Sequence, residues 1–166
     1  GSILETGTGV VTLNIGASDE FSTTGADKTF AAAITSTDAT GTLDIDGTAT
    51  FSDTVQAGII TVADTTTFSS TLTNTGLMTV SGTTTVTGTY TGTGAANIDA
   101  ATTFSGDASF NNSTTTLLAH TLTFNGDTLT AGATAGITTD AAAAALTFGG
   151  SGDQTVAAKI TPDTTN

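Results

Sequence analysis

Apolar and polar residues alternate along short stretches of the chain, and this alternation returns at a longer, nearly constant period. The segment that begins at Ile45 is repeated from Val62, Val80 and Ile98, so its starting points are almost evenly spaced. Alternation with a period of two predicts a short β-strand that buries one face. A constant longer period in a chain of short strands indicates a repeat fold, in which each repeat stacks on the one before it.

The repeat defines columns, by which we mean equivalent positions that become neighbours when the repeats stack. We expect the apolar columns to fill the interior and the hydroxyl columns to line the exterior. The apolar columns are Phe51, Phe68, Val86, Phe104 and Leu122; Ile45, Val62, Val80 and Ile98; Val55, Leu72, Tyr90 and Ala108; and Ile60, Met78 and Ala96. The polar columns are Thr50, Thr67, Thr85, Thr103 and Thr121; Ser52, Ser69, Thr87, Ser105 and Thr123; and Thr48, Thr65 and Thr83.

A finer spacing of six residues divides each repeat into three parts. Val80, Val86 and Ile98 follow this spacing, and a small residue such as Gly82 or Gly88 often comes two positions later, where a tight corner would exclude a Cβ. The predicted fold class is therefore all-β, a single-chain parallel β-helix (β-solenoid) with about 18 residues and three short strands per coil. The alternative is an intertwined trimeric fibre, in which the apolar columns face a shared axis.

The regularity of the repeat also predicts how the chain is organised. We expect residues 1–2 to be a cloning scar, 3–43 irregular N-terminal coils, 44–130 the regular β-solenoid, 131–160 C-terminal coils or a cap, and 161–166 a linker. Residues 140–146 include five Ala, so a short capping helix is an alternative there. Residues 146–157 predict a hairpin or a loop between coils.

The composition excludes several classes of function. The chain has 45 Thr and 20 Gly, two Lys, no Arg and 15 acidic residues, which gives a net charge of −13. Two cations cannot neutralise many phosphates, so we expect no nucleic-acid binding, and an anionic membrane surface would repel the chain. The absence of Cys excludes disulfides and zinc fingers. No apolar run approaches the ~20 residues of a membrane-spanning helix, so we expect no membrane insertion.

Two segments carry a resemblance to known proteins. Residues 47–52 (Gly-Thr-Ala-Thr-Phe-Ser) and 146–156 (Leu-Thr-Phe-Gly-Gly-Ser-Gly-Asp-Gln-Thr-Val), within the Thr- and Gly-rich coils, resemble repeats of large bacterial β-solenoid surface proteins. Autotransporter passengers, filamentous adhesins and some surface-layer proteins contain such repeats. The resemblance implies a secreted or cell-surface location and a structural or adhesive role as a stalk, spacer or lattice module. Its partners would be neighbouring domains, copies of itself, or a host or cell-surface ligand.

Pairs of Thr separated by one residue form the sharpest candidate for a binding surface. Such arrays on β-solenoids resemble those of ice-binding proteins, so ice binding is an alternative function. A second face carries similar pairs at 71/73 and 89/91, which also fits a general soluble exterior. The candidate surface-binding array consists of Thr48, Thr50, Thr65, Thr67, Thr83 and Thr85.

Acidic residues offer a further alternative, calcium-dependent assembly. Carboxylate oxygens are ligands for Ca²⁺, and residues 149–153 (Gly-Gly-Ser-Gly-Asp) are similar to the calcium-binding β-roll repeat, with the acid one position early. Solvated turn acids are the default interpretation, so we expect no cofactor otherwise. The acids considered are Asp44, Asp46, Asp99, Asp107, Asp127 and Asp153.

Catalytic residues are not indicated. His120 is the only His, and in the repeat alignment it falls in the column of Ala49, Thr66, Thr84 and Thr102, where no oriented acid marks a catalytic triad. The chain has no Trp, no Arg and one Tyr, so it lacks the groups that usually hold a sugar substrate beside paired carboxylates. We therefore expect that the protein is not an enzyme.

Overall fold

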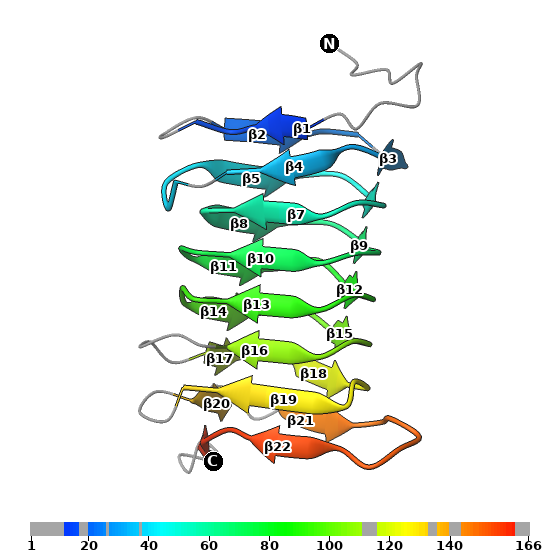
Figure 1. Ribbon diagram of the computed structural model, residues 1–166, viewed down its shortest axis with the longest axis vertical. Helices are drawn as coiled ribbons and strands as arrows, with labels where there is room; N and C mark the ends of the chain where they lie inside the picture. Colours follow the sequence, from blue (N-terminus) through cyan, green and yellow to red (C-terminus); the bar gives the residue numbers. More distant parts are fainter. Residues whose placement is uncertain are drawn as a thin grey trace.

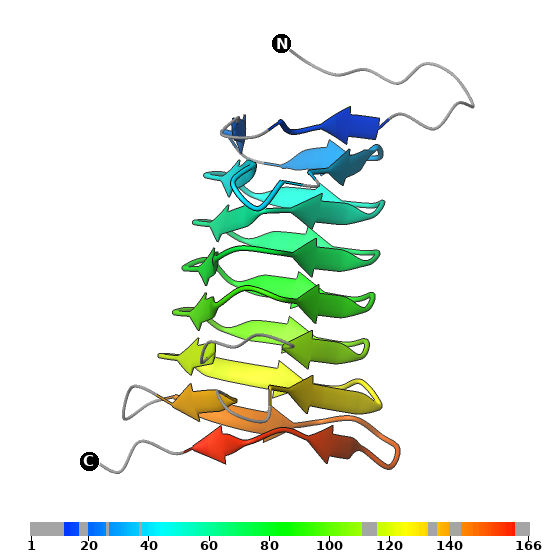
Figure 2. The same ribbon diagram turned by 60° about the vertical axis from the view of Figure 1, so that its left-hand side comes forward.

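The computed structural model describes residues 12–16, 20–25, 27–36, 38–110, 116–132, 136–139 and 144–161. These residues form 23 short β-strands, which wind into coils that stack along one axis (Figures 1 and 2). No helix that could cross a membrane is found in the described ranges. The result is a parallel β-solenoid, as the repeat predicts.

Each coil contributes one strand to each of three parallel sheets, which we name A, B and C. Sheet A contains β1 (Thr12–Asn14), β4 (Ala33–Thr35), β7 (Val55–Ala57), β10 (Leu72–Asn74), β13 (Tyr90–Gly92), β16 (Ala108–Phe110), β19 (Thr128–Ala131) and β22 (Thr155–Ala157). Sheet B contains β2 (Glu20–Thr23), β5 (Thr42–Ile45), β8 (Ile59–Val62), β11 (Met78–Val80), β14 (Ala96–Ile98), β17 (Thr116–Leu118), β20 (Ile137–Thr139) and β23 (Ile160–Thr161). Sheet C contains β3 (Lys28–Phe30), β6 (Ala49–Phe51), β9 (Thr66–Phe68), β12 (Thr84–Val86), β15 (Thr102–Phe104), β18 (Thr121–Phe124) and β21 (Ala145–Phe148).

Coil length varies along the chain, while the strands stay in register. The central coils are the shortest and are nearly equal in length, and longer coils lie on both sides of them. Strands β1–β4, in the segment expected to be irregular, join the same three sheets as the later strands. One line of paired positions in sheet C shows this variation, because more residues separate successive positions near its two ends than at its centre. The line runs through Lys28, Ala49, Thr66, Thr84, Thr102, Leu122 and Leu146.

The sequence distance between a strand of sheet A and the next strand of sheet B differs widely from coil to coil. Six positions separate β4 from β5 and five separate β16 from β17, whereas Gly58 alone separates β7 from β8. Because the insertions fall between strands, they lengthen a coil without moving its strands out of register.

The predicted columns are wrong where the coil length changes. A constant period placed Leu122 after Phe104, but the residue paired with Phe104 is Phe124, and Leu122 pairs with Thr102. The coil that contains β17 is longer than the previous one, so a fixed period falls out of step there. Thr121 and Thr123 shift for the same reason, and Thr123 rather than Thr121 pairs with Thr103.

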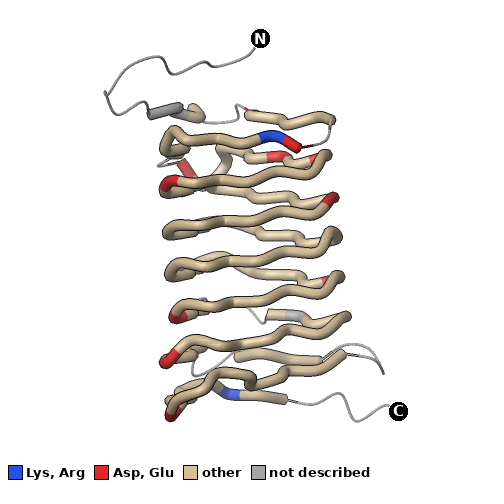
Figure 3. Tube along the Cα trace, turned by 90° about the vertical axis from the view of Figure 1, so that its right-hand side faces the viewer, with Lys and Arg blue, Asp and Glu red and all other residues tan. Residues whose placement is uncertain are grey.

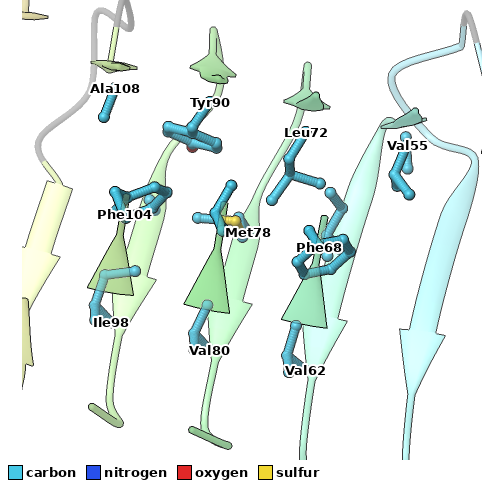
Figure 4. Packing of buried hydrophobic residues seen from close by; sticks show 14 of the residues in the cluster. Val55, Val62, Phe68, Leu72, Met78, Val80, Tyr90, Ile98, Phe104 and Ala108 are labelled. Atoms are coloured by element: carbon cyan, nitrogen blue, oxygen red, sulfur yellow. The ribbon is translucent and has the colours of Figure 1, made fainter. Parts of the chain in front are cut away.

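The apolar columns fill the interior, as predicted. Phe51 stacks on Phe30 and Phe68 with ring-centroid distances of 4.9 and 5.1 Å, and all three rings belong to one column. Figure 4 shows the columns Val62–Val80–Ile98 and Leu72–Tyr90–Ala108 pointing into the same interior. Each buried Phe contributes on the order of 1.5–3 kcal/mol relative to an exposed one. The chain's own sheets enclose these columns, so a shared trimeric axis is not needed to bury them.

A column of Thr also points inward, which differs from the expectation that hydroxyl columns line the exterior. Thr66, Thr84 and Thr102 are at most 3% exposed. Each hydroxyl donates a hydrogen bond to the carbonyl two residues earlier, at distances of 3.0–3.1 Å. This local bond satisfies the hydroxyl at the corner, so that a β-branched polar residue can occupy a core position.

A second buried polar group connects neighbouring coils. The Tyr90 hydroxyl donates to Asn74 Oδ1 at 2.6 Å, and Asn74 Nδ2 donates to the Gly76 carbonyl at 2.7 Å. Tyr90 and Asn74 are both 0% exposed. A Cβ at Gly92, which pairs with Asn74, would overlap the Tyr90 hydroxyl, so this glycine provides space for the phenol.

Small residues at the corners allow one coil to lie directly on the next. A Cβ at Gly82 would overlap the backbone of Asp64 in the preceding coil, and a Cβ at Gly94 would overlap the backbone of Gly76. The described glycines with positive φ are Gly25 and Gly136. At Gly82 and Gly94, glycine is therefore required by the close approach of the coils rather than by the turn conformation.

The C-terminal part continues the solenoid. The alternative prediction of a capping helix over residues 140–146 is wrong at Ala145 and Leu146. Both residues belong to strand β21, which pairs with β18. Residues 140–143 lie outside the described ranges. Of the two structures expected for residues 146–157, the loop is confirmed, because β21 and β22 lie in different sheets.

We predict that alkaline pH destabilises the protein through Tyr90. Burial raises the pKa of Tyr90, so the folded protein keeps its proton above pH ~10, where an exposed Tyr ionises. The unfolded chain releases that proton, so the free energy of unfolding should fall by about 1.4 kcal/mol per pH unit above pH ~10. Chemical denaturation measures this slope, and tyrosinate absorbance reports on Tyr90 alone because the chain has one Tyr.

The variant Tyr90→Phe serves as the control for this prediction. It should lack this contribution to the slope, and it should lose about 1–3 kcal/mol at neutral pH because Asn74 Oδ1 is left buried without its donor. Ionisation of Tyr90 near pH 10 in a chain that remains folded would contradict the prediction.

A second prediction concerns the corners. Gly82→Ala should lower the free energy of unfolding by about 1–3 kcal/mol, because the new Cβ forces the coils apart. Gly152→Ala is the matched control, since nothing lies within 4 Å of a Cβ at that position. Thermal unfolding followed by circular dichroism measures both variants. Equal melting temperatures would show that the corner tolerates the methyl group.

Candidate functional site: the threonine face of sheet C

The outward face of sheet C carries an unbroken column of threonines, one from every strand of the sheet. The predicted Thr50, Thr67 and Thr85 lie in it as consecutive neighbours. The column extends beyond them at both ends. Its members are Thr29, Thr50, Thr67, Thr85, Thr103, Thr123 and Thr147.

Two further lines of mostly hydroxyl residues flank this column. Thr48, Thr65 and Thr83 come two residues before its members, at the corner that leads into sheet C, and Thr65 and Thr83 are exposed. The structure therefore brings the six predicted array residues together on one side of the solenoid. Ala101 interrupts this first line, and Thr121 continues it. The second line follows the strands and consists of Ser52, Ser69, Thr87, Ser105 and Asn125.

The geometry of a β-sheet makes this face a two-dimensional lattice. Neighbouring strands are about 4.7–4.9 Å apart, and alternate residues along a strand are about 6.6 Å apart. Each Thr presents one hydroxyl and one methyl group at a lattice point. Among the described residues, no hydrogen bond joins the hydroxyls of this column to one another, so they can bond to an external partner. A partner that matches the face must itself repeat at a similar spacing.

The same face is electrically neutral over most of its length. The described acids lie mainly at corners, as Figure 3 shows, and the two that lie within strands, Glu20 and Asp44, both belong to sheet B. Lys28, at the start of β3, is the one charged residue in a described strand of sheet C. The strands of sheet C therefore carry hydroxyl and methyl groups with Lys28 as their one charged residue, and the described strands of sheet A carry no charged residue.

The outward face of sheet A is less regular. Its central column contains Thr73 and Thr91, as predicted, but Gln56 and Ala157 interrupt the hydroxyls. Thr130 donates to the Ser109 hydroxyl at 2.9 Å, so part of the hydroxyl capacity is used within the protein. Sheet C is therefore the better candidate for a binding surface.

The acids considered as calcium ligands are dispersed. Asp99, Asp107 and Asp127 lie at corners, and Asp153 lies in the loop between β21 and β22. Asp107 Oδ1 accepts hydrogen bonds from the backbone N–H groups of Asp127 and Thr128, at 3.1 and 2.8 Å, so it connects two coils. In the part of the chain that the structure describes, no three His, Cys, Asp or Glu residues are grouped as metal ligands would be.

Asp44 and Asp46 lie close together near the N-terminal end of sheet B. Burial of the Asp44 carboxyl raises its pKa, and the negative charges of Asp46 and Glu20 raise it further. The negative charges of these three carboxylates therefore repel one another at neutral pH.

His120 lies exposed at the corner before β18, outside the column predicted for it, because Leu122 pairs with Thr102 in its place. Its Nδ1 accepts a hydrogen bond from the backbone N–H of Thr121 at 2.9 Å. This bond holds the imidazole ring against the turn.

Four members of the column, Thr29, Thr103, Thr123 and Thr147, were not predicted to belong to the array. A signal was present in the sequence, because each of them is followed directly by Phe, as are Thr50 and Thr67. The Thr-Phe pair marks an outward hydroxyl beside an inward ring, and it persists where the coil length changes.

Comparison with family models, with curated proteins and with solved structures gives no match for this chain. Its function is therefore inferred from the geometry of the solenoid and its faces.

Proposed function

We propose that this chain is a structural segment, a stalk, spacer or lattice module, of a secreted cell-surface protein. The observation that carries the proposal is the continuity of the stack, in which three sheets of 8, 8 and 7 strands run through the described residues without a break. Each coil packs on its neighbours, so stability adds up along one axis and length can be set by the number of coils.

The direction of the hydrogen bonds supports a mechanical role. In every sheet the bonds between strands run from coil to coil, along the axis of the stack. A load along that axis therefore acts on all the bonds between two coils at once. The chain has a net charge of −13, and many of its acids lie at exposed corners. This charge favours solubility and is consistent with an extracellular location. Neighbouring domains or copies of the chain would be its partners, with adhesion through a loop or an end as a further role.

A spacer must keep its length under load, and we predict that this protein does so. The double variant Thr29→Cys/Thr147→Cys places a thiol at each end of the Thr column. Dyes or pulling handles attach to these two thiols alone, because the chain has no native Cys. Six coil intervals separate the two positions, so their distance should be about 29 Å with a narrow distribution. In a tweezers experiment this length should remain constant at low force and then increase in discrete steps as whole coils detach.

The matched control is Thr50→Cys/Thr67→Cys, which spans a single interval between coils. It should give one rupture rather than a series. Gradual lengthening of the long-span variant from the smallest loads would contradict a spacer role.

The threonine face of sheet C favours a second candidate function, ice binding. Its seven consecutive Thr form a regular array of hydroxyl and methyl groups. A solid lattice such as ice repeats in two dimensions, so many weak contacts can form at once without a pocket.

We predict that Thr85→Tyr removes most of any thermal hysteresis, because the large ring lifts the lattice partner away from the neighbouring Thr of sheet C. Thr91→Tyr, at the equivalent position in sheet A, should retain the activity and serves as the control. Thermal hysteresis and inhibition of ice recrystallisation measure both. No effect of the unmodified protein at millimolar concentration would eliminate this function.

A further inference from the structure

The corner that follows β18 contains the single Asn–Gly pair of the sequence, Asn125–Gly126. Asn125 is half-buried and Gly126 is buried. In such a pair the side-chain amide carbon lies close to the next backbone nitrogen along the chain, and glycine has no Cβ to hinder their approach. Asn is a chemically labile residue on prolonged exposure to water. The pair is therefore a candidate for a reaction between its own two groups.

Backbone hydrogen bonding distinguishes Asn125 from the other Asn residues that the structure describes. After Asn14 and Asn74, the next backbone N–H donates to a carbonyl of a neighbouring coil, at 3.0 and 3.1 Å. Asn97 lies inside β14, which pairs with β11 on one side and β17 on the other. The N–H of Gly126 bonds to no described group. Its nitrogen is therefore not held in a ladder, as the other three are.

The side-chain amide of Asn125 is also free of described hydrogen-bond partners. By contrast, the buried amide of Asn74 is held by two hydrogen bonds, at 2.6 and 2.7 Å. Asn125 lies against the loop between β21 and β22, which Figure 1 draws in orange. A Cβ at Gly149 of that loop would lie 2.6 Å from Asn125 Oδ1, so the glycine leaves room for the amide. No described hydrogen bond has to break before the amide can turn.

One side chain of the next coil holds the backbone of this corner. Gln154 Nε2 donates to the carbonyls of Phe124 and Gly126, at 3.2 and 2.8 Å. The two carbonyls lie on either side of Asn125, so Gln154 restrains rotation of the backbone between them. The reaction of Asn125 with Gly126 needs such a rotation, and Gln154 therefore opposes it.

We propose that Asn125 is a site of non-enzymatic deamidation, and that Gln154 limits its rate. The Gly126 nitrogen gives its proton to solvent and attacks Asn125 Cγ. The new N–Cγ bond replaces the Cγ–Nδ2 bond, Nδ2 leaves as ammonia, and a cyclic succinimide remains. Water then cleaves one of the two C–N bonds of the imide, which gives aspartate or isoaspartate at position 125. Water is the one co-reactant, and nothing is oxidised or reduced.

The product changes the border of the threonine face. Asn125 belongs to the line of polar residues that flanks the Thr column of sheet C, two positions after Thr123. The reaction adds one negative charge to that line, so the net charge of the chain goes from −13 to −14. Isoaspartate also adds one carbon to the backbone, at a corner rather than within a paired strand. This inference goes beyond the proposed function and does not depend on it.

Peptide mapping by mass spectrometry tests the proposal on the unmodified chain. The folded protein is incubated in mildly alkaline buffer, and circular dichroism confirms that it stays folded. We expect position 125 to lose its amide and to become a substrate for enzymatic methylation of isoaspartate, while Asn14, Asn74 and Asn97 keep their amides. The proposal is overturned if Asn125 stays intact in the folded chain while the same chain in urea reacts, or if Asn97 reacts equally fast.

Two pairs of variants separate the site from the residue that restrains it. Asn125→Ser introduces the residue found at the equivalent position of the preceding coil, Ser105, and should remove the signal at this position, whereas Asn97→Ser should leave it unchanged. Gln154→Ala should raise the rate at Asn125 several-fold. Gln56→Ala is its matched control, because the Gln56 amide, on the outward face of sheet A, bonds to no described group. Equal rates in these last two variants would contradict the restraint by Gln154.

Discussion

The spacing between hydrogen-bonded strands is the constraint on which the rest of this structure depends. Each coil donates backbone hydrogen bonds to the next, and those bonds fix the separation at about 4.7–4.9 Å. At that separation a residue meets its equivalent in the next coil before it meets anything else. Aromatic rings therefore stack, as Phe51 does on Phe68, and corners without side chains, such as Gly82, are required where two turns of backbone lie one on the other.

The same constraint determines which polar groups the core can hold. A hydroxyl that points inward must find its partner within its own coil or in the one beside it. Thr84 bonds to the carbonyl of Gly82 in its own corner, and Tyr90 bonds to Asn74 in the preceding coil. Among the described residues, the buried hydroxyls of Thr23, Thr75 and Thr116 have no partner, and each such group costs about 1–3 kcal/mol. Thr23 and Thr116 lie in sheet B, in coils that are longer than the central ones, and Thr75 lies at the corner between β10 and β11.

Much of this fold could be predicted from the sequence, because the repeat is regular between Ile45 and Ala108. Period and alternation together identify the columns, the inward rings and the outward Thr. What could not be predicted follows from the corners. A corner can take extra residues at little cost, so periodicity alone loses the register, as it did between Phe104 and Phe124. The inward Thr66 was also not predictable from hydropathy, because its hydroxyl is satisfied by a bond to the Asp64 carbonyl that depends on the local turn. The array on sheet C was partly predicted, at strands β6, β9 and β12.

The corner between sheets A and B has a consequence for how such proteins diversify. Gly58 alone separates β7 from β8 there, six positions separate β4 from β5, and the strands on either side remain paired in both cases. A position that accepts such different lengths is a natural point for grafting foreign sequence, since loops exposed on a rigid scaffold tolerate insertion and acquire new functions. Successive coils would then display several grafted peptides in a row at regular intervals.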